Sequence, residues 1–380
     1  MKKRNRPSGY DYFGILKNHL KDLSKIFSGK LTYPRQMEIH LPADHKRACN
    51  FNCSYCAGKL FIKDLDTWEL TALELLHKLK DAIPFNIFGG AYTEPLLNPY
   101  FMTFLHTTKK LGSHFGIHTN GSLLKLLEEH QGWLTNLCRI STDRKDYLSI
   151  SLDAGLAESH NSNKGIRKGS WFNDIIEGIG LATKIRRKTK AKGPTIRLCY
   201  LMTETNSSPR EIKKIVEAAK KLKVDSLRFS IPFSFYNQEF DKVRRYRDAI
   251  ERQLENKFHN LVKPYLTSAS KRPHIFYVSS VFQDIDVYDF PQCIYGYYQI
   301  TLGADGYVYR CSTTATPSFS QFRLGKITSD LKKFNKMILA GQDPNFKAFS
   351  CFKAGGRCNR QATECNRTYR DLKKQKNYHD

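Results

Sequence analysis

Three cysteines near the start of the chain have the spacing of ligands to one inorganic centre. Cys49, Cys53 and Cys56 lie four and three positions apart, in a loop soon after a short strand-like run. Thiolates bind both zinc and iron–sulfur clusters. A zinc site needs a fourth nearby ligand, for which His45 is the close candidate, whereas a 4Fe–4S cluster held by three cysteines keeps one iron open to another ligand. The residues alone leave both kinds of centre open.

A second group of cysteines lies in the last quarter of the chain, and two more stand alone. The group consists of Cys293, Cys311, Cys351, Cys358 and Cys365. Cys138 sits in an apolar setting and is expected in the core, while Cys199 falls inside a strand-like run. In a reducing compartment, clustered cysteines are more often metal ligands or catalytic thiols than disulfides.

The composition describes a folded protein with a strongly basic surface. The 380 residues are 40% hydrophobic, with a mean hydropathy of −0.52 and no apolar run long enough to span a membrane. No signal-peptide run follows the basic N-terminus, so a cytoplasmic protein is expected. Lys and Arg number 62 against 36 Asp and Glu, a net charge of +26. This excess favours an anionic or acidic partner, and a basic surface that only serves solubility is the alternative.

The elements that must position the cysteines alternate between strands and helices. Apolar and β-branched runs predict strands at 36–41, 85–88, 114–119, 147–152, 195–202 and 226–233, and amphipathic runs predict helices at 71–82, 100–111, 123–137, 172–187, 209–222 and 239–258. Six such units predict an α/β fold, an open, partial (β/α)6 TIM-like barrel. Chemistry is then expected just after each strand, because ligands bind at the C-terminal ends of parallel strands. Thr71 followed by Glu74 has capping-box spacing, and Pro209 after two serines also marks a helix start.

The chain divides into four stretches. We expect a basic N-terminal extension at 1–35, a core α/β domain at 36–260, a polar linker at 261–290 and a small cysteine-rich α+β extension at 291–380. In the last stretch, the runs 298–302 and 307–310 flank a Gly-Ala-Asp-Gly turn and predict a β-hairpin.

The cysteine loop, C-x3-C-x2-C with Tyr55 before the last cysteine, resembles the signature of the radical S-adenosylmethionine (radical SAM) superfamily. The likeness extends over residues 36–235. It implies a 4Fe–4S cluster on Cys49, Cys53 and Cys56, with S-adenosylmethionine bound at the open iron. Reductive cleavage would then give a 5′-deoxyadenosyl radical that abstracts hydrogen from the substrate, with an electron donor such as flavodoxin or ferredoxin.

Several residues near the cysteines and the strand ends match positions at which this superfamily binds S-adenosylmethionine. They are Tyr55, Gly89, Gly90, Glu94, Asn120, Ser151, Asp153 and Arg228. Gly90 and Glu94 resemble the glycine-rich motif of the family, although three extra residues separate them. Glycine lets the backbone approach a ligand closely, and a carboxylate can accept hydrogen bonds from the methionine ammonium. A family arginine corresponds to Lys164 or Arg167, and the sequence does not choose between them.

The second cysteine group resembles another family feature. The spacing Cys293-x12-Gly306-x4-Cys311 is similar to the opening of the SPASM and twitch extensions, which hold auxiliary 4Fe–4S clusters. The later cysteines depart from the two-cluster pattern, since six residues separate each neighbouring pair. The resemblance implies a shortened domain with one auxiliary cluster on Cys293, Cys311 and Cys351, and with Cys358 or Cys365 as the fourth ligand. Zinc or unliganded thiols are the alternative.

Three functions suit a radical SAM enzyme with this charge. The first is a maturase that modifies a peptide or protein, and the alternative is a small-molecule dehydrogenase or epimerase acting on a sugar or aminocyclitol. A nucleic-acid modifying enzyme is the third, and a purely structural iron–sulfur protein is the non-enzyme interpretation. Cys199 is expected to be a core thiol, and a hydrogen donor is the alternative, because some relatives return a hydrogen atom to a substrate radical from a cysteine thiol.

Overall fold

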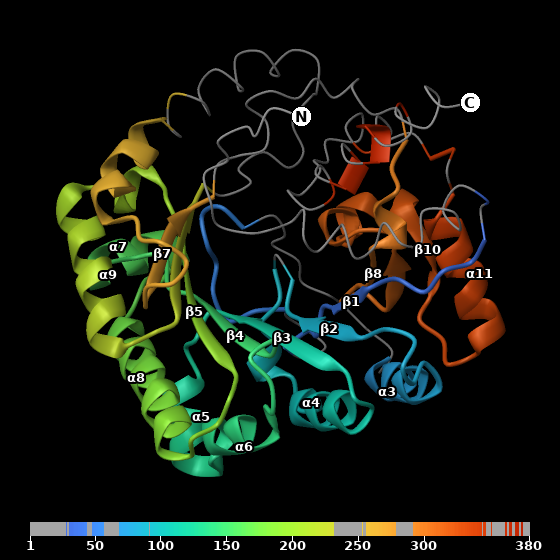
Figure 1. Ribbon diagram of the computed structural model, residues 1–380, viewed down its shortest axis with the longest axis horizontal. Helices are drawn as coiled ribbons and strands as arrows, with labels where there is room; N and C mark the ends of the chain where they lie inside the picture. The colour runs from blue at the N-terminus through green and yellow to red at the C-terminus, as the bar shows by residue number, and fades with distance from the viewer. Residues whose placement is uncertain are drawn as a thin grey trace.

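The structure is a computed structural model that describes residues 28, 30–43, 48–56, 68–90, 92–231, 253, 256–278, 292–343, 345–346, 351, 362, 365–366, 369–371 and 374. Its strands form one ten-stranded sheet in the order β10-β9-β8-β1-β2-β3-β4-β5-β6-β7 (Figure 1). They are β1 (Gln36–Ile39), β2 (Phe85–Phe88), β3 (His114–Thr119), β4 (Tyr147–Ser151), β5 (Thr195–Leu201), β6 (Ser226–Ser230), β7 (His274–Tyr277), β8 (Gln299–Leu302), β9 (Tyr307–Tyr309) and β10 (Arg323–Lys326).

Strands β1 to β7 run parallel, each paired with the next in chain order. The edge strands β7 and β10 do not pair with each other, so the barrel is open. The predicted α/β fold with a partial barrel is therefore confirmed. β7 pairs in parallel with β6 and extends the barrel beyond its six strand–helix units.

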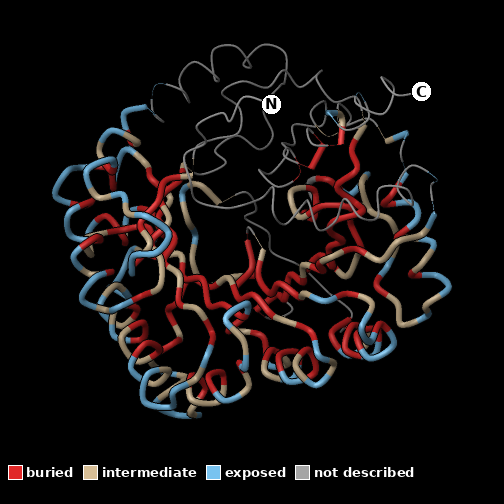
Figure 2. Tube along the Cα trace, in the orientation of Figure 1, coloured by how far each residue is buried: buried red, intermediate tan, exposed pale blue. Residues whose placement is uncertain are grey.

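Helices cover the outer face of this sheet, as Figure 1 shows. They are α3 (Glu69–Lys78), α4 (Phe101–Lys110), α5 (Leu124–Gln131), α6 (Trp133–Ile140), α7 (Ala157–Lys164), α8 (Phe172–Lys188), α9 (Pro209–Leu222) and, in the C-terminal part, α11 (Leu331–Gly341). Figure 2 shows buried residues on the strands and on the sides of the helices that face them, and exposed residues along the outer sides. No described helix is long and apolar enough to cross a membrane.

The alternation of side chains along the strands separates an apolar outer face from a polar inner face. On β5, Ile196, Leu198 and Tyr200 belong to the hydrophobic core beneath the helices. Successive side chains of a strand point to opposite faces, so Arg197 and Cys199 face the barrel interior. The sequence thereby builds a barrel whose interior can hold polar chemistry.

Two predictions about the helices are wrong. The N-cap of α3 is Trp68, so Thr71 lies inside the helix and does not cap it. The stretch 123–137 holds two helices, because Gly132 adopts φ 60° and ends α5 before α6 begins. The other predicted helix start is confirmed, since the Ser208 side chain caps α9.

Strand β8 joins the C-terminal part of the chain to the barrel sheet. It pairs in parallel with β1, Gln36 opposite Gln299, and antiparallel with β9, which confirms the predicted hairpin. β7 falls inside the stretch 261–290, of which residues 279–290 lie outside the described part of the chain, as do residues 1–27. The boundaries of the four stretches stay predictions.

Candidate functional site

The cysteine loop, residues 48–56, follows β1 at the C-terminal end of the barrel strands. Two N–H groups donate to the Cys49 sulfur, one from the Phe51 backbone at 3.4 Å and one from the Asn120 amide at 3.6 Å. Hydrogen bonds to sulfur are among the interactions that set the potential of an iron–sulfur cluster. Burial raises the pKa of the free Cys49 thiol to about 12, so a bound metal would offset the cost of its thiolate.

Lys164 forms a buried ion pair behind this loop. Its ammonium lies 2.5 Å from the Asp153 carboxylate and donates to the Tyr55 hydroxyl at 2.9 Å, and that hydroxyl donates to Asp153 at 2.5 Å. The side chains of Lys164 and Asp153 are 2% and 0% exposed. Burial acts to lower the pKa of Lys164, but Asp153 and Cys53 outweigh it and the pKa is raised. The structure thus places Lys164 at the site, while Arg167 is exposed.

The backbone of α7 also holds the cysteine loop. The N–H of Asn52 donates to the Lys164 carbonyl and the N–H of Ser54 to the Asn163 carbonyl, both at 3.0 Å. Gly165 ends α7 with φ 65°, and a Cβ there would lie 2.2 Å from the Asn52 carbonyl oxygen. Glycine is therefore required for this close approach. The loop is fixed against α7 by main chain as well as by side chains.

Glu94 is a buried carboxylate, 1% exposed, on the other side of the loop. It accepts hydrogen bonds from the Thr119 hydroxyl and the Asn120 N–H, both at 2.6 Å, and from the Leu96 N–H at 3.1 Å. Its own N–H donates to the Ala48 carbonyl at 3.0 Å, which ties it to the cysteine loop. Burial raises the pKa of Glu94 to about 7 against the effect of these hydrogen bonds, so its charge changes near neutral pH.

The glycines that precede Glu94 are tightly packed. Gly89 has φ 111°, and a Cβ there would lie 2.4 Å from a carbonyl oxygen of β3. A Cβ on Gly90 would lie 2.6 Å from the His40 ring. Of the inserted residues, Tyr92 donates to the Ala315 carbonyl at 2.6 Å. The insertion therefore links the site to the C-terminal part of the chain, a role that sequence reasoning missed.

Polar side chains of neighbouring strands meet in the barrel interior near this end. The strand register places Ser151, Cys199 and Arg228 side by side on β4, β5 and β6. The Cys199 sulfur lies 3.0 Å from the Ser149 hydroxyl. Cys199 is buried on the inner face of the sheet.

Cationic groups surround a neutral histidine deeper in the interior. The Arg197 guanidinium stacks on the Tyr147 ring at 4.0 Å, and the Tyr147 hydroxyl lies 2.8 Å from Nε2 of His118. Burial lowers the pKa of His118 to about 4, Glu38 opposes this shift, and Arg228 and Arg197 add to it. Sequence reasoning missed Arg197, although its place beside Cys199 in the strand alternation could have indicated it.

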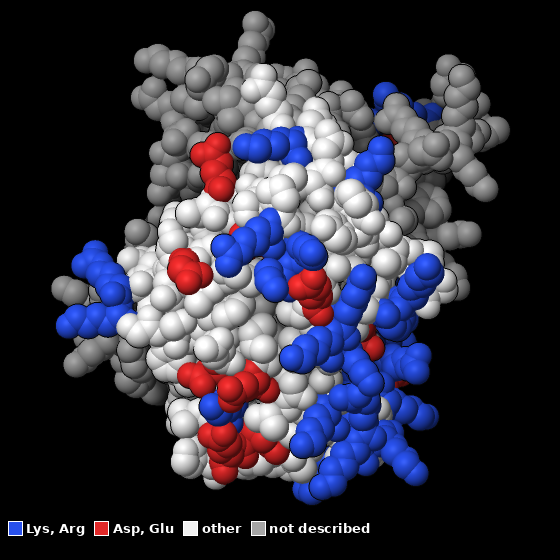
Figure 3. Space-filling model, turned by 90° about the vertical axis from the view of Figure 1, so that its left-hand side faces the viewer, with Lys and Arg blue, Asp and Glu red and all other residues white. Residues whose placement is uncertain are grey.

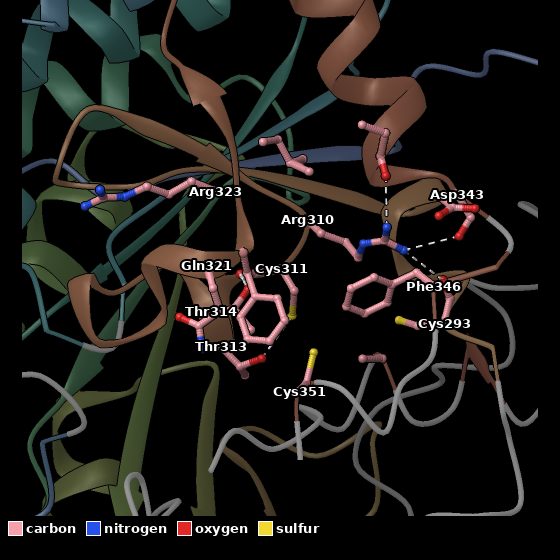
Figure 4. Close-up of a pocket in the computed structure, with 14 residues that line it drawn as sticks. Cys293, Arg310, Cys311, Thr313, Thr314, Gln321, Arg323, Asp343, Phe346 and Cys351 are labelled. Atoms are coloured by element: carbon pink, nitrogen blue, oxygen red, sulfur yellow. Dashed lines mark hydrogen bonds between the residues drawn. The ribbon is translucent and has the colours of Figure 1, made fainter. Parts of the chain in front are cut away.

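The second cysteine group encloses a cavity of about 220 Å³ lined by Cys293, Cys311 and Cys351. Figure 4 shows the three sulfurs pointing toward the same space, from separate segments of the C-terminal part. Burial raises the pKa of Cys311 to about 12 and also raises that of Cys351. The structure thus brings together three of the five predicted ligands.

The two remaining cysteines of the second group differ in what the structure describes. Cys365 is buried, and the neighbouring Asn366 amide donates to the Cys293 sulfur at 3.7 Å, so this turn of helix lies against the pocket. Cys358 lies outside the described residues. Of the two, Cys365 is therefore the one whose surroundings the structure shows.

Arg310 brings a buried positive charge to the same pocket. It is 7% exposed, and its guanidinium stacks on the Phe346 ring at 3.8 Å (Figure 4). It donates to the carbonyls of Cys293 at 3.3 Å, Ala340 at 2.9 Å and Asp343 at 3.5 Å. No salt bridge joins Arg310 to a carboxylate in the part of the chain that the structure describes. Sequence reasoning missed Arg310, and its place directly before Cys311 was the available signal.

Among the described residues, no three His, Cys, Asp or Glu side chains converge as the ligands of a single metal ion would. The cysteines of a 4Fe–4S cluster each bind a different iron. The thiols of both cysteine groups have the donor chemistry of such a cluster.

The site and the fold are similar to known proteins. Residues 44–205 match the model of the Radical SAM superfamily. The fold resembles SuiB of Streptococcus suis bound to precursor peptide SuiA, with a TM-score of 0.52 and 14% identity over 83% of this chain and 69% of that one. It also resembles SuiB bound to S-adenosylmethionine, with a TM-score of 0.51 and 14% identity over 87% of this chain and 71% of that one. No curated protein sequence matches the chain.

The open barrel of parallel strands and the cysteine loop after its first strand agree with the match to the radical SAM family model. Residues 44–205 are a radical SAM domain, and the chain that carries it is an enzyme.

Proposed function

We propose that the protein is a radical SAM enzyme that modifies a peptide or a protein. The observation that carries this proposal is the constellation at the C-terminal end of the barrel, where the cysteine loop meets the buried groups Glu94 and Lys164. The loop fits a 4Fe–4S cluster, because it offers three thiols and its N–H donors already reach one of them. Such a cluster, when bound, supplies the electron that cleaves S-adenosylmethionine to the radical that abstracts hydrogen.

The residues around the loop have separate tasks in this proposal. Glu94, which titrates near pH 7, accepts hydrogen bonds from the methionine ammonium in its ionised form. Asn120 orients Cys49 through its amide. Tyr55, Asp153 and Lys164 fix the cysteine loop against α7 through their hydrogen bonds. They thereby keep water from the inner side of the loop. Of the remaining predicted cofactor residues, Ser151 and Arg228 lie on the inner face of the strands.

The charge of the barrel interior supports an acidic substrate. Arg197 and Arg228 lie on the inner face of β5 and β6, so two cations face the barrel interior. The net charge of +26 also favours an acidic substrate. SuiB, whose fold this chain resembles, has been solved with its precursor peptide. Cys199 lies beside Arg228 in the strand register. A substrate bound in the barrel interior next to Arg228 would therefore be close to the Cys199 thiol, which could donate a hydrogen atom to it.

The C-terminal pocket fits an auxiliary 4Fe–4S cluster on Cys293, Cys311 and Cys351, with Cys365 or Cys358 as the fourth ligand. A buried guanidinium costs free energy unless an anion accompanies it, and a thiolate-bound cluster is an anion. Arg310 therefore supports an anionic occupant. A shortened SPASM or twitch-like domain, and reduction by flavodoxin or ferredoxin, follow from the same proposal.

Formation of 5′-deoxyadenosine tests the radical chemistry. After anaerobic reconstitution with iron and sulfide, we expect dithionite and S-adenosylmethionine to yield this product. Cys53→Ala should reduce it to background, because the loop loses a cluster ligand. Cys138→Ala is the matched control, since Cys138 is a buried thiol on α6, away from both cysteine groups. Product from the Cys53 variant at the control rate would contradict the assignment.

The substrate class is tested separately. Short open reading frames encoded beside the gene supply candidate peptides, which are incubated with the reconstituted enzyme and analysed by mass spectrometry. A mass change in a peptide that requires both S-adenosylmethionine and Cys53 supports a maturase. A change only in added sugars or aminocyclitols would establish the small-molecule alternative instead.

A further inference from the structure

A concentration of positive charge lies at the end of the barrel opposite the cysteine loop. The turns at residues 141–146, 189–194 and 223–225 precede β4, β5 and β6, so they lie at the N-terminal ends of parallel strands. These three strands are neighbours in the sheet, and their turns therefore form one continuous surface. Its exposed cations, here called the basic face, are Arg139, Arg144, Lys145, Lys184, Arg187, Lys188, Lys190, Lys192, Lys220, Lys221 and Lys223.

The charge of the basic face is offset only in small part from within the described part of the chain, where Asp143 in the turn at 141–146 interacts electrostatically with Lys145. Asp225 at its edge pairs with Arg186, which is not one of the exposed cations, and Glu217 pairs with Lys214. None of the side chains of the basic face forms a salt bridge with a described residue. Figure 3 shows Lys and Arg crowded over the lower right of the side that carries α8 and α9, while acidic groups gather at the lower left. The field of this surface therefore favours an extended anion.

A hollow opens within the basic face. It has a volume of about 540 Å³, which is in the range of ligand sites. Its lining residues are Thr135, Cys138, Arg139, Ser141, Thr142, Thr189, Ala191 and Lys192. Arg139 and Lys192 supply cations to its walls, and Ala191 and Cys138 supply apolar atoms. Such a hollow can take a flat group whose charge stays near the two cations.

The composition of the basic face identifies the kind of anion. The exposed large apolar side chains of the described residues all lie elsewhere, at Leu70, Leu126, Trp171, Leu266 and Leu339. Protein interfaces are enriched in aromatic anchors and depleted of Lys, so an acidic protein would find no anchor here. Phosphate contacts need only Lys and Arg placed along a surface. The face has the chemistry of phosphate contacts and lacks that of a protein interface.

We propose that the basic face binds the phosphate backbone of a nucleic acid, with one nucleotide seated in the hollow between Arg139 and Lys192. The face lies across the barrel from the cysteine loop, so this nucleic acid is a bound partner and not the molecule that the radical attacks. The inference goes beyond the proposed function and does not depend on it.

Fluorescence anisotropy tests the inference with the full-length reconstituted protein. The probes are labelled oligouridine and oligothymidine of about 20 nucleotides. The triple variant Lys188→Glu, Lys192→Glu, Lys221→Glu removes three cations of the face. The control variant Lys332→Glu, Lys333→Glu, Lys336→Glu makes the same change of net charge on exposed positions of α11. Circular dichroism checks that both variants are folded.

We expect binding that weakens as salt rises. Loss of three phosphate contacts should reduce the slope of log K against log salt by about 2, and should weaken binding on the order of 100-fold at about 0.1 M salt. The control should stay within about threefold of the natural protein. The oligouridine and oligothymidine arms then show whether RNA or DNA is the better partner, and binding of either supports the proposal.

Three results would overturn it. Equal losses in the two triple variants would mean that net charge alone draws the oligonucleotide. If the protein bound no oligonucleotide but bound poly-glutamate through the same lysines, the partner would be an acidic protein. If the protein bound no oligonucleotide but bound phosphatidylserine vesicles, the partner would be a membrane surface.

Discussion

The two cysteine regions differ in how their buried cations are neutralised. At the cysteine loop, Lys164 is paired with the Asp153 carboxylate at 2.5 Å. At the C-terminal pocket, the hydrogen bonds of Arg310 go to backbone carbonyls, and its guanidinium stacks on Phe346. A buried ion is costly unless a counter-charge accompanies it. The first cation thus belongs to the folded protein itself, whereas we infer that the second is matched by an anion inside the pocket.

On this inference, the cysteine loop is a preformed site, whereas the C-terminal pocket would be completed by the group that it binds. Lys164 and the backbone of α7 hold the cysteine loop through hydrogen bonds of the protein itself. In the pocket, three cysteines from separate segments are brought together beside Arg310. A group bound by all three would tie these segments to one another, as metal binding does in other small domains.

The largest expected effect separates the two regions by activity. Cys311→Ala should leave formation of 5′-deoxyadenosine without substrate within about threefold of the natural enzyme, because cleavage needs the loop cluster alone, while Cys53→Ala should abolish it. Turnover of the peptide should be lost in both. Liquid chromatography of the product and of the peptide gives the two rates. If cleavage were lost equally in both variants, the two regions would not be separable.

The stability of the metal-free protein gives the next largest effect. Lys164→Met leaves the buried Asp153 carboxylate unpaired and should lower the free energy of unfolding by about 3–5 kcal/mol. Arg310→Met removes hydrogen bonds to carbonyls and a buried charge, and should cost about 1–3 kcal/mol. The midpoint of urea unfolding measures both.

Lys125→Met is the control for this pair. Lys125 makes partly exposed ion pairs with Asp174 and Glu177, so its loss should cost less than about 1 kcal/mol. If Arg310→Met lowered the free energy of unfolding more than Lys164→Met, the proposed difference between the two buried cations would be contradicted.

Glu94 offers a test of the cofactor site that has no counterpart in the C-terminal pocket. A hydrogen bond to a charged group contributes about 1.5–3 kcal/mol, so Glu94→Gln should weaken S-adenosylmethionine binding by about 10- to 100-fold. Equilibrium dialysis of the reconstituted protein measures the dissociation constant. Glu69→Gln is the matched control, because Glu69 is a buried carboxylate on α3 that accepts from Asn98. Equal affinities in the two variants would remove Glu94 from the site.

The pH dependence of binding is the smaller effect. Burial raises the pKa of Glu94 from 4.5 to about 7, and Lys164 opposes the shift. Affinity for S-adenosylmethionine should therefore rise with pH up to about 7 and then level off, and it should be flat in Glu94→Gln.

Folding stability should respond in the opposite direction. Because the folded pKa is raised, the stabilising contribution of Glu94 is full below pH 4.5 and is lost as pH rises through about 7, by about 3 kcal/mol. The difference in urea midpoint between the natural metal-free protein and Glu94→Gln measures this loss. A difference that does not change with pH would contradict the raised pKa.

Much of the fold follows from the sequence where a strand is short and bounded by turn residues. The strands at 85–88 and 114–119 are predicted to the residue. The break in 123–137 is not, because apolar periodicity continues through Gly132 and only its positive φ ends the helix. The pairing of β8 with β1 joins residues far apart in the chain, and no local pattern encodes it.

The site was predictable where residue type alone defines the chemistry, as for the cysteine loop. The choice of Lys164 over Arg167 was not, because it depends on how α7 docks on Asn52 and Ser54. The position of Arg310 directly before Cys311 is visible in the sequence, but its burial is not, since that arises from Phe346 and from α11 packing over it. Buried cations are assigned by tertiary contacts that no spacing reveals.

The number of irons per chain tests the central claim most directly. After anaerobic reconstitution, iron and sulfide are counted in the natural protein and in the variants Cys53→Ala, Cys311→Ala and Cys138→Ala. Two clusters predict about eight irons in the natural protein and in Cys138→Ala, and about four in each of the other two. About four irons in the natural protein, unchanged by Cys311→Ala, would contradict a cluster in the C-terminal pocket and with it the comparison of the two regions.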